Sequence, residues 1–245
     1  MHSGQKVEEQ LVSQAMETAI ISQLDAAEEI DIDIQTDLFK LFQGQAEGIS
    51  VEGQGLVIQD VRVQEVEVQT TGIAVNPLSA ILGKIELNKP VNANVRLVFT
   101  EADLNRALTS NFVKSKMQKF DLNINGEIIS LIPQVFKINL LELGKFRIAG
   151  KVLIQKQGTI QPLTFQAVAR PRTHEQPIIL ESFVCAEDEG ISLELATAFM
   201  QKMKELTQLP YLKLEDFAFR IKNLEIEKDY MTLLIQVHLR KIPLI

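Results

Sequence analysis

The spacing of apolar residues changes near residue 29. Before it, apolar side chains recur every three to four residues, in neighbouring rows that begin at Val7 and Val12. This is the spacing of an amphipathic helix. From residue 29 onward most segments alternate apolar and polar residues, which is typical of a strand with one buried face. The pattern predicts a tail over residues 1–4, a long helix over residues 5–28 and mostly strands over residues 29–245.

Shorter helices are predicted between the strands. The apolar spacing indicates helices near residues 101–117 and 191–206, and apolar helical turns over residues 37–44 and 76–83. Short polar turns join the strands, and no regular strand–helix–strand alternation occurs, which argues against a parallel sheet. We therefore predict an α+β fold in one domain over residues 1–245, with a strongly curved, largely antiparallel sheet on which a few helices pack.

One irregularity interrupts this alternation. Apolar residues occupy every second position through Val61 and Val63, and again through Val66 and Val68, but the two series are out of step. An extra residue in one strand of a pair produces such a step. The sequence therefore predicts a bulge or bend between Val63 and Val66.

Composition and charge narrow the range of functions. Apolar residues make up 46% of the chain and charged residues 23%, as in ordinary globular proteins. The net charge of −7 argues against nucleic-acid binding, which requires a basic face. Residues 1–60 carry two basic and twelve acidic side chains, so the remaining 185 residues balance to +3. The acidic part is either a solvated surface or a binding surface for a basic partner.

The sequence has no recognisable membrane-spanning or export signal. No apolar run approaches the ~20 residues that span a bilayer. Residues 1–29 lack the basic region and apolar core of a secretory signal. The sequence therefore predicts a cytoplasmic protein, which can still contact a membrane peripherally.

Groups for catalysis or metal binding are scarce. The chain has one cysteine and three scattered histidines, and no phosphate loop, nucleophile elbow or zinc motif occurs. Glu101 and Asp103 lie at the start of a predicted helix and point in different directions. Thr100 fits the N-cap and Asp103 the third helical position of a capping box. We predict no enzyme activity, no cofactor and no metal; convergence of either acid with His174 in a cleft would indicate otherwise.

Two apolar clusters and one lysine group are candidate binding residues. Each apolar cluster lies where strands are interrupted and is either core or an exposed rim that contacts lipid. The candidate lipid-contact residues are Leu38, Phe39, Leu41, Phe42, Leu78, Ile81 and Leu82. Lys114, Lys116 and Lys119 either complement a helix dipole or lie near anionic lipid head groups.

The chain resembles the bacterial LmeA-like phospholipid-binding family. The resemblance rests on Pro90–Leu108, where an alternating strand leads into T-E-A-D-L-N, and on the strand, turn and apolar short helix of Val61–Gly83. It implies a fold of the tubular lipid-binding kind, in which an elongated curved antiparallel sheet wraps a long helix and leaves an apolar groove for acyl chains. It also implies a role in maintaining the cell envelope. Exported members carry an N-terminal signal or anchor, which these residues lack.

The residues and the resemblance agree on one functional hypothesis. The protein binds, and in an extended form of the hypothesis transfers, phospholipid or another acyl lipid without enzymatic change. An apolar groove between the sheet and the N-terminal helix would supply ~0.8 kcal/mol for each methylene that it buries. The alternative is a structural or protein-interaction domain, with its core closed by side chains and an acidic N-terminal surface for its partner.

Overall fold

Strands dominate the architecture of the protein. The computed structural model describes residues 17–18, 20–22, 24–36, 39–40, 43–75, 87–117, 119–171, 179–185, 197–198, 201, 212–214 and 217–240. The strands there are β1 (Glu29–Gln35), β2 (Gln45–Ile58), β3 (Val61–Ala74), β4 (Val91–Thr100), β5 (Phe120–Ile124), β6 (Glu127–Leu141), β7 (Lys145–Lys156), β8 (Thr159–Arg170), β9 (Ile179–Cys185), β10 (Leu212–Leu214), β11 (Phe217–Glu227) and β12 (Tyr230–Leu239).

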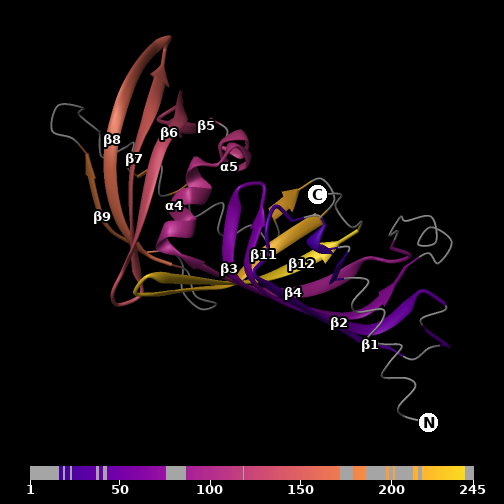
Figure 1. The fold of residues 1–245 in the computed structure, drawn as a ribbon. Helices are drawn as coiled ribbons and strands as arrows, with labels where there is room; N and C mark the ends of the chain where they lie inside the picture. The colour runs from indigo at the N-terminus through magenta and orange to yellow at the C-terminus, as the bar shows by residue number, and fades with distance from the viewer. Residues whose placement is uncertain are drawn as a thin grey trace.

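These strands form two sheets, and every named pairing is antiparallel. The seven-stranded sheet has the order β1-β2-β3-β4-β12-β11-β10, and the five-stranded sheet has the order β5-β6-β7-β8-β9. Figure 1 shows the two sheets meeting at an angle, with a helix lying in that angle. The predicted antiparallel, curved arrangement is confirmed, but in two sheets.

Tight turns fix the register of three hairpins. Both central residues have positive φ in Gln59–Asp60, Asn125–Gly126 and Gln157–Gly158. Two positive φ values define the type I′ turn, whose twist matches that of the flanking strands. The predicted short polar turns are therefore confirmed, and each places the apolar residues of both strands on the same face.

The predicted helix over residues 101–117 is two helices, α4 (Glu101–Thr109) and α5 (Asn111–Lys116). Ser110 separates them in an extended conformation, with φ −65° and ψ 151°. Its hydroxyl accepts a hydrogen bond from the Val113 backbone N–H at 3.1 Å. A serine cap satisfies one of the free N–H groups at a helix start, so Ser110 ends one helix and begins the next.

The predicted N-terminal helix extends too far at its C-terminal end. Ile20 and Ile21 are helical, but Asp25 and Ala26 pair with Val57 near the end of β2, through hydrogen bonds of 2.9 and 2.8 Å. The chain leaves the helix because this edge of β2 offers unpaired backbone groups beyond β1. Several predicted features lie outside the described residues. They are the helix over residues 5–16, the helical turn at 76–83 and most of the helix at 191–206. The predicted wrapping of the sheet around the N-terminal helix lies outside them as well.

Each sheet has one predominantly apolar face, which we call its inner face. Alternate residues of a strand point to opposite faces, and the registers align the apolar positions of neighbouring strands. On the seven-stranded sheet these are Ile30, Ile32, Ile34, Ile49, Val51, Val66, Val68, Val91, Ala93, Val95, Leu97, Phe99, Phe219, Ile221, Leu224, Ile226, Met231, Leu233, Ile235, Val237 and Leu239. On the five-stranded sheet they include Leu122, Ile129, Leu131, Phe136, Ile138, Leu140, Phe146, Ile148, Val152, Ile154, Leu163, Phe165, Ala167, Ala169 and Phe183.

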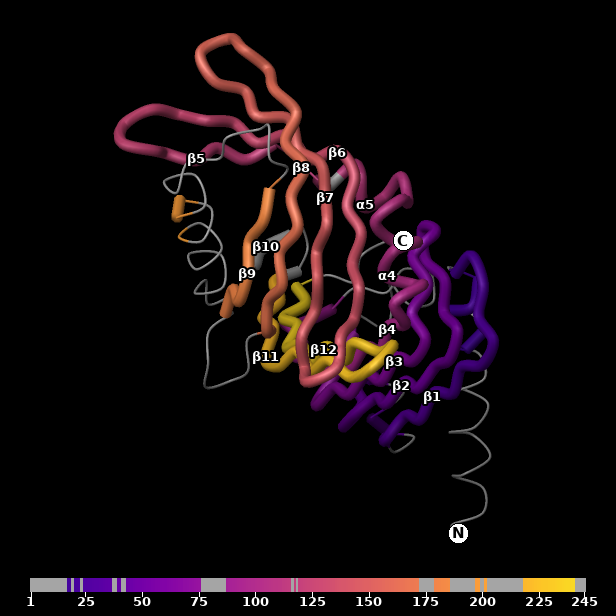
Figure 2. The backbone as a smooth tube through the Cα atoms, turned by 90° about the vertical axis from the view of Figure 1, so that its left-hand side faces the viewer, coloured from indigo at the N-terminus to yellow at the C-terminus, as the bar shows by residue number. Residues whose placement is uncertain are grey.

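The two inner faces share a core at the corner of the molecule. Leu140 of the five-stranded sheet is buried with Ile226 and Met231 of the seven-stranded sheet, and Leu104 of α4 packs against them. A second core lies on the five-stranded sheet around Leu131, and the helical residue Ala198 packs against it. The sheets therefore meet along one edge, and α4 lies in the angle between them, as Figure 2 also shows from the side.

Of the predicted bulge or bend between Val63 and Val66, the bulge is wrong, whereas a bend has support from Gly55 of β2, which lies between the pairs Gln54↔Glu65 and Leu56↔Val63 and has φ +60°. β2 and β3 keep a single register from Gln45↔Ala74 to Ile58↔Val61. The apolar series changes step because Arg62 and Gln64 occupy inner-face positions, where the strand passes the start of α4. Polar side chains replace apolar ones there because they bind a polar partner, which is described below.

Candidate functional site

An apolar row crosses the inner face of the seven-stranded sheet. Ile32, Val51, Val68, Val95, Ile235 and Ile221 come from β1, β2, β3, β4, β12 and β11, and each is paired with the next. Neighbouring strands lie about 4.8 Å apart, so the row is about 24 Å long. An acyl chain reaches half of the ~30 Å hydrocarbon core of a bilayer. The row is therefore longer than an acyl chain laid across the strands.

Burial decreases along this row. Ile32 is 3% exposed and Ile221 is 42% exposed, and the four residues between them are half-buried. A closed core would bury all six residues, because each aliphatic side chain gains about 1.5–3 kcal/mol from complete burial. The inner face thus keeps accessible apolar surface along its middle and at its β11 end.

The outer face of the same sheet is mostly polar, although Val98 is buried there. Its charged positions include Glu29, Asp31, Asp33, Glu52, Glu65, Glu67, Arg96, Arg220, Glu225 and Glu227. Arg96 bridges Glu65 and Glu67 at 3.1 and 2.8 Å. The charged outer face suits water or charged groups, so the inner face is the more favourable surface for acyl chains.

Aromatic side chains add to the apolar surface of the five-stranded sheet. Phe165 packs edge-on against Phe136, with ring centroids 6.1 Å apart, and stacks on Phe183 at 5.6 Å. Phe136 lies over Gly150 on the neighbouring strand, where a Cβ atom would come within 2.6 Å of its ring. The glycine gives the ring the room to lie flat on the sheet.

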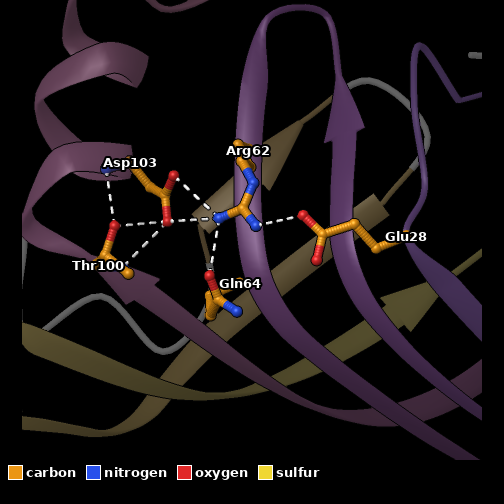
Figure 3. Close-up of polar contacts among 5 residues, drawn as sticks. All are labelled: Glu28, Arg62, Gln64, Thr100 and Asp103. Carbon is orange, nitrogen blue, oxygen red and sulfur yellow. Dashed lines mark hydrogen bonds and ion pairs between the residues drawn. The ribbon is translucent and has the colours of Figure 1, made fainter.

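The T-E-A-D-L-N segment begins α4 with a complete capping box (Figure 3). The Thr100 hydroxyl accepts a hydrogen bond from the Asp103 backbone N–H at 3.0 Å, and the Asp103 carboxylate accepts one from the Thr100 backbone N–H at 3.3 Å. The predicted roles of Thr100 and Asp103 are confirmed. Glu101 and Asp103 also lie in the first turn, at the positive end of the helix dipole, which favours negative charge.

Asp103 also connects α4 to the seven-stranded sheet. Arg62 of β3 donates from Nη1 to both carboxylate oxygens of Asp103, at 3.2 and 3.3 Å. Its Nη2 donates to Glu28 at 2.7 Å, and Nη1 also reaches Gln64 at 2.8 Å. The hydrogen bond to Glu28, together with the bond and charge of Asp103, outweighs partial burial and raises the pKa of Arg62. Arg62 therefore joins the strand, the helix and the N-terminal segment.

Glu101 and Asn105 connect α4 to the five-stranded sheet. The Asn105 amide donates to the Ile138 carbonyl at 2.7 Å and accepts from the Ile138 N–H at 2.9 Å, as a neighbouring strand would. Glu101 accepts from the Leu140 N–H at 2.8 Å and from the Asn139 amide at 2.9 Å. β5 pairs only with residues 127–131 of β6, so this edge lacks another strand partner. The two side chains supply its missing hydrogen bonds.

The structure describes only some of the residues singled out from the sequence. Phe39, Lys114 and Lys119 are exposed. The remaining candidates lie outside the described residues: the side chain of Lys116, and Leu38, Leu41, Phe42, Leu78, Ile81 and Leu82. The apolar row itself was not singled out, although the alternation that builds it is visible in every strand.

The described residues form no metal site and no membrane-spanning helix. Within the described residues, no group of three or more His, Cys, Asp or Glu side chains is placed to hold a metal ion. No helix there is both long and apolar enough to cross a membrane. His238 lies on the outer face and contacts the Asn92 side chain at 2.8 Å, and His174 is outside the described residues.

Comparison with known proteins gives one decisive result. The model of the LmeA-like phospholipid-binding family matches residues 4–236. The chain belongs to this family. No curated protein and no solved structure matches it. The match extends the resemblance from Val61–Gly83 and Pro90–Leu108 to both sheets of this LmeA-like chain.

Proposed function

We propose that the protein binds phospholipid, or another acyl lipid, without changing it chemically. The observation that carries the proposal is the apolar row from Ile32 to Ile221, which stays half-buried through its middle. Membership of a phospholipid-binding family supports it. Each acyl methylene that leaves water against this row contributes ~0.8 kcal/mol.

The angle between the sheets suggests how a lipid is held. The acyl chains lie along the inner face of the seven-stranded sheet, on the side toward which the five-stranded sheet turns its own apolar face. The head group stays outside, because burial of an unpaired phosphate is strongly unfavourable. Lys114 and Lys119 are exposed near the end of α5 and are the head-group contacts that we propose. Phe39, also exposed, is a candidate rim contact.

This proposal includes the broader role of the protein. A lipid carrier must reach a membrane, so we include peripheral membrane contact and transfer of lipid in the proposal. We also infer that residues 1–245 act as one elongated domain, because the corner core and α4 tie the two sheets together. A protein-interaction domain is the competing possibility, and it would hold no lipid.

Native mass spectrometry after gentle purification tests lipid binding. The expected spectrum contains the protein with phospholipid bound. Val68→Phe, in the middle of the row, should lower the bound fraction because the larger ring fills apolar surface. Gln69→Phe is the matched control, since its side chain points to the outer face and is exposed. Lipid-free protein that also ignores liposomes would refute the proposal; equal lipid content in both variants would refute the assignment to this row.

A further inference from the structure

Exposed aliphatic side chains gather on the outer face of the five-stranded sheet. Val135 is 66% exposed and Ile160 54% exposed, and Ile128 is also exposed. Ile132 and Leu153 are half-buried beside them. The registers place all five in the half of the sheet that ends in the β5–β6 and β7–β8 turns. Single exposed aliphatic residues are common, whereas a contiguous group marks an interaction surface.

The charged neighbours of this group are mostly basic. Lys137 and Lys151 lie on the same face and are exposed, and Lys119, just before β5, is exposed as well. Among the described residues, the acid in this half of the face is Asp121, which accepts a hydrogen bond from the Ser130 hydroxyl at 2.5 Å. Toward the other end of the face, Lys145 and Arg170 share Glu181 at 2.6 Å each.

The two sheets differ in the charge of their outer faces. Acids dominate the outer face of the seven-stranded sheet, and the exposed large apolar residue there is Tyr230, beside a turn. The five-stranded sheet instead presents aliphatic side chains among lysines. An anionic surface would be attracted by the five-stranded sheet and repelled by the seven-stranded sheet. The charge pattern therefore favours the five-stranded sheet as the docking face and an anionic surface as its partner.

We propose that this half of the outer face, the β6–β8 patch (Ile128, Ile132, Val135, Leu153 and Ile160 with Lys137 and Lys151), docks on an anionic phospholipid bilayer. Figure 2 shows the β5–β6 and β7–β8 hairpins projecting from the body of the molecule, which suits contact with a flat surface. Lysines attract the head groups, and the aliphatic side chains enter the interface between head groups and acyl chains. This inference rests on the proposed lipid binding and names the membrane contact that lipid exchange would use.

Sedimentation with phosphatidylglycerol vesicles tests the proposal, with phosphatidylcholine vesicles as the neutral comparison. The protein should bind the anionic vesicles more strongly, and binding should weaken as salt shortens the screening length. Lys137→Gln with Lys151→Gln should lower the vesicle partition coefficient about 25-fold, at about fivefold for each lysine. Val135→Ser with Ile160→Ser should lower it about tenfold or more, because two aliphatic side chains no longer leave water.

Two control variants lie far from the patch. Leu143→Ser removes an exposed aliphatic side chain from the β6–β7 turn, at the opposite end of the sheet. Lys228→Gln removes an exposed lysine from the β11–β12 turn. Neither should change vesicle binding, and circular dichroism should show all four variants folded.

Measuring bound lipid and vesicle binding on the same samples separates the possible failures. Patch variants that keep their bound lipid but no longer sediment with the anionic vesicles support the proposal. Patch variants that sediment with vesicles like the unmodified protein overturn it and leave lipid binding intact. An unmodified protein that carries no lipid and does not sediment with either kind of vesicle overturns lipid binding and this inference together. If the patch variants lose self-association in sedimentation velocity while vesicle binding is unchanged, the partner is a second copy of the chain and the proposal is wrong.

Discussion

Replacing Asp103 by alanine should weaken the joint between α4 and the seven-stranded sheet. The carboxylate is nearly buried, with a side chain 7% exposed, and it accepts hydrogen bonds from Thr100 and from Arg62. Loss of its part in the capping box costs about 0.5–1 kcal/mol. Loss of the charged hydrogen bonds from Arg62 costs about 1.5–3 kcal/mol. The two losses add to about 2–4 kcal/mol, and we expect about 2–3 kcal/mol because Arg62 keeps other partners.

The expected loss of stability for Asp103→Ala is smaller than the cost of leaving a buried charge without a partner. After Asp103→Ala, Arg62 still donates to Glu28 and Gln64, at 2.7 and 2.8 Å. Breaking a buried pair that leaves one charge alone costs about 3–5 kcal/mol, so the remaining partners lower the penalty. Glu28 is the largest cause of the raised pKa of Arg62, but its side chain is 62% exposed. Water competes for it, so Glu28→Ala should cost less than about 1 kcal/mol.

Urea and thermal unfolding of the two variants measure this difference. For a chain of this size, 2–3 kcal/mol corresponds to a decrease in Tm of about 5–10 °C. A double-mutant cycle between Arg62→Met and Asp103→Ala isolates the pair, and we expect a coupling energy of about 1 kcal/mol or more. A coupling near zero, or a loss for Asp103→Ala no larger than that for Glu28→Ala, would refute the joint.

Three further predictions concern stability. Thr100→Ala should cost about 1 kcal/mol in urea unfolding and leave the lipid content of the folded fraction unchanged; a specific loss of lipid would contradict a purely structural role. Asn105→Leu should cost about 2–3 kcal/mol, because it leaves one N–H and one carbonyl of β6 unpaired; a change within the error of the measurement would mean that water replaces the amide. Glu181 has a lowered pKa, because Lys145 and then Arg170 bind its carboxylate. Because the pKa is lower in the folded state, the ionised Glu181 stabilises the fold at pH values above the ordinary pKa of 4.5. This stabilisation is lost as the pH falls through the lowered pKa of the folded state. The Tm of Glu181→Gln should therefore fall below that of the unmodified protein at neutral pH and converge with it in acid; a difference independent of pH would contradict this.

Local patterns were sufficient to predict much of the fold. Strand alternation has a period of two residues, and the capping box at Thr100 spans four residues, so neighbours in sequence determine both. The arrangement in two sheets depends on β12, which joins the seven-stranded sheet beside β4 although more than a hundred residues separate them. Spacing along the chain contains no information on that pairing. The end of the N-terminal helix was misplaced for a similar reason, since Val57 supplies the competing hydrogen bonds.

Only one partner of the Arg62–Asp103 contact could be predicted from the sequence. Asp103 could be assigned to the cap, but its partner Arg62 lies 41 residues earlier. The out-of-step apolar series between Val63 and Val66 is the available signal, and from the sequence alone it indicates a bulge or bend. Two polar residues at inner-face positions produce the same pattern, and only the register of β2 and β3 distinguishes the two explanations.

The acids of T-E-A-D-L-N set the geometry of an apolar surface. Asp103 attaches α4 to β3 of one sheet, while Glu101 and Asn105 attach it to β6 of the other. Because α4 follows β4 directly, these three attachments fix the angle at which the two inner faces meet. Both carboxylates already accept hydrogen bonds from protein donors, which leaves less of their capacity for a substrate. Their contribution to lipid binding is therefore indirect: variants at these positions should change stability first, and the size of the lipid that fits between the sheets second.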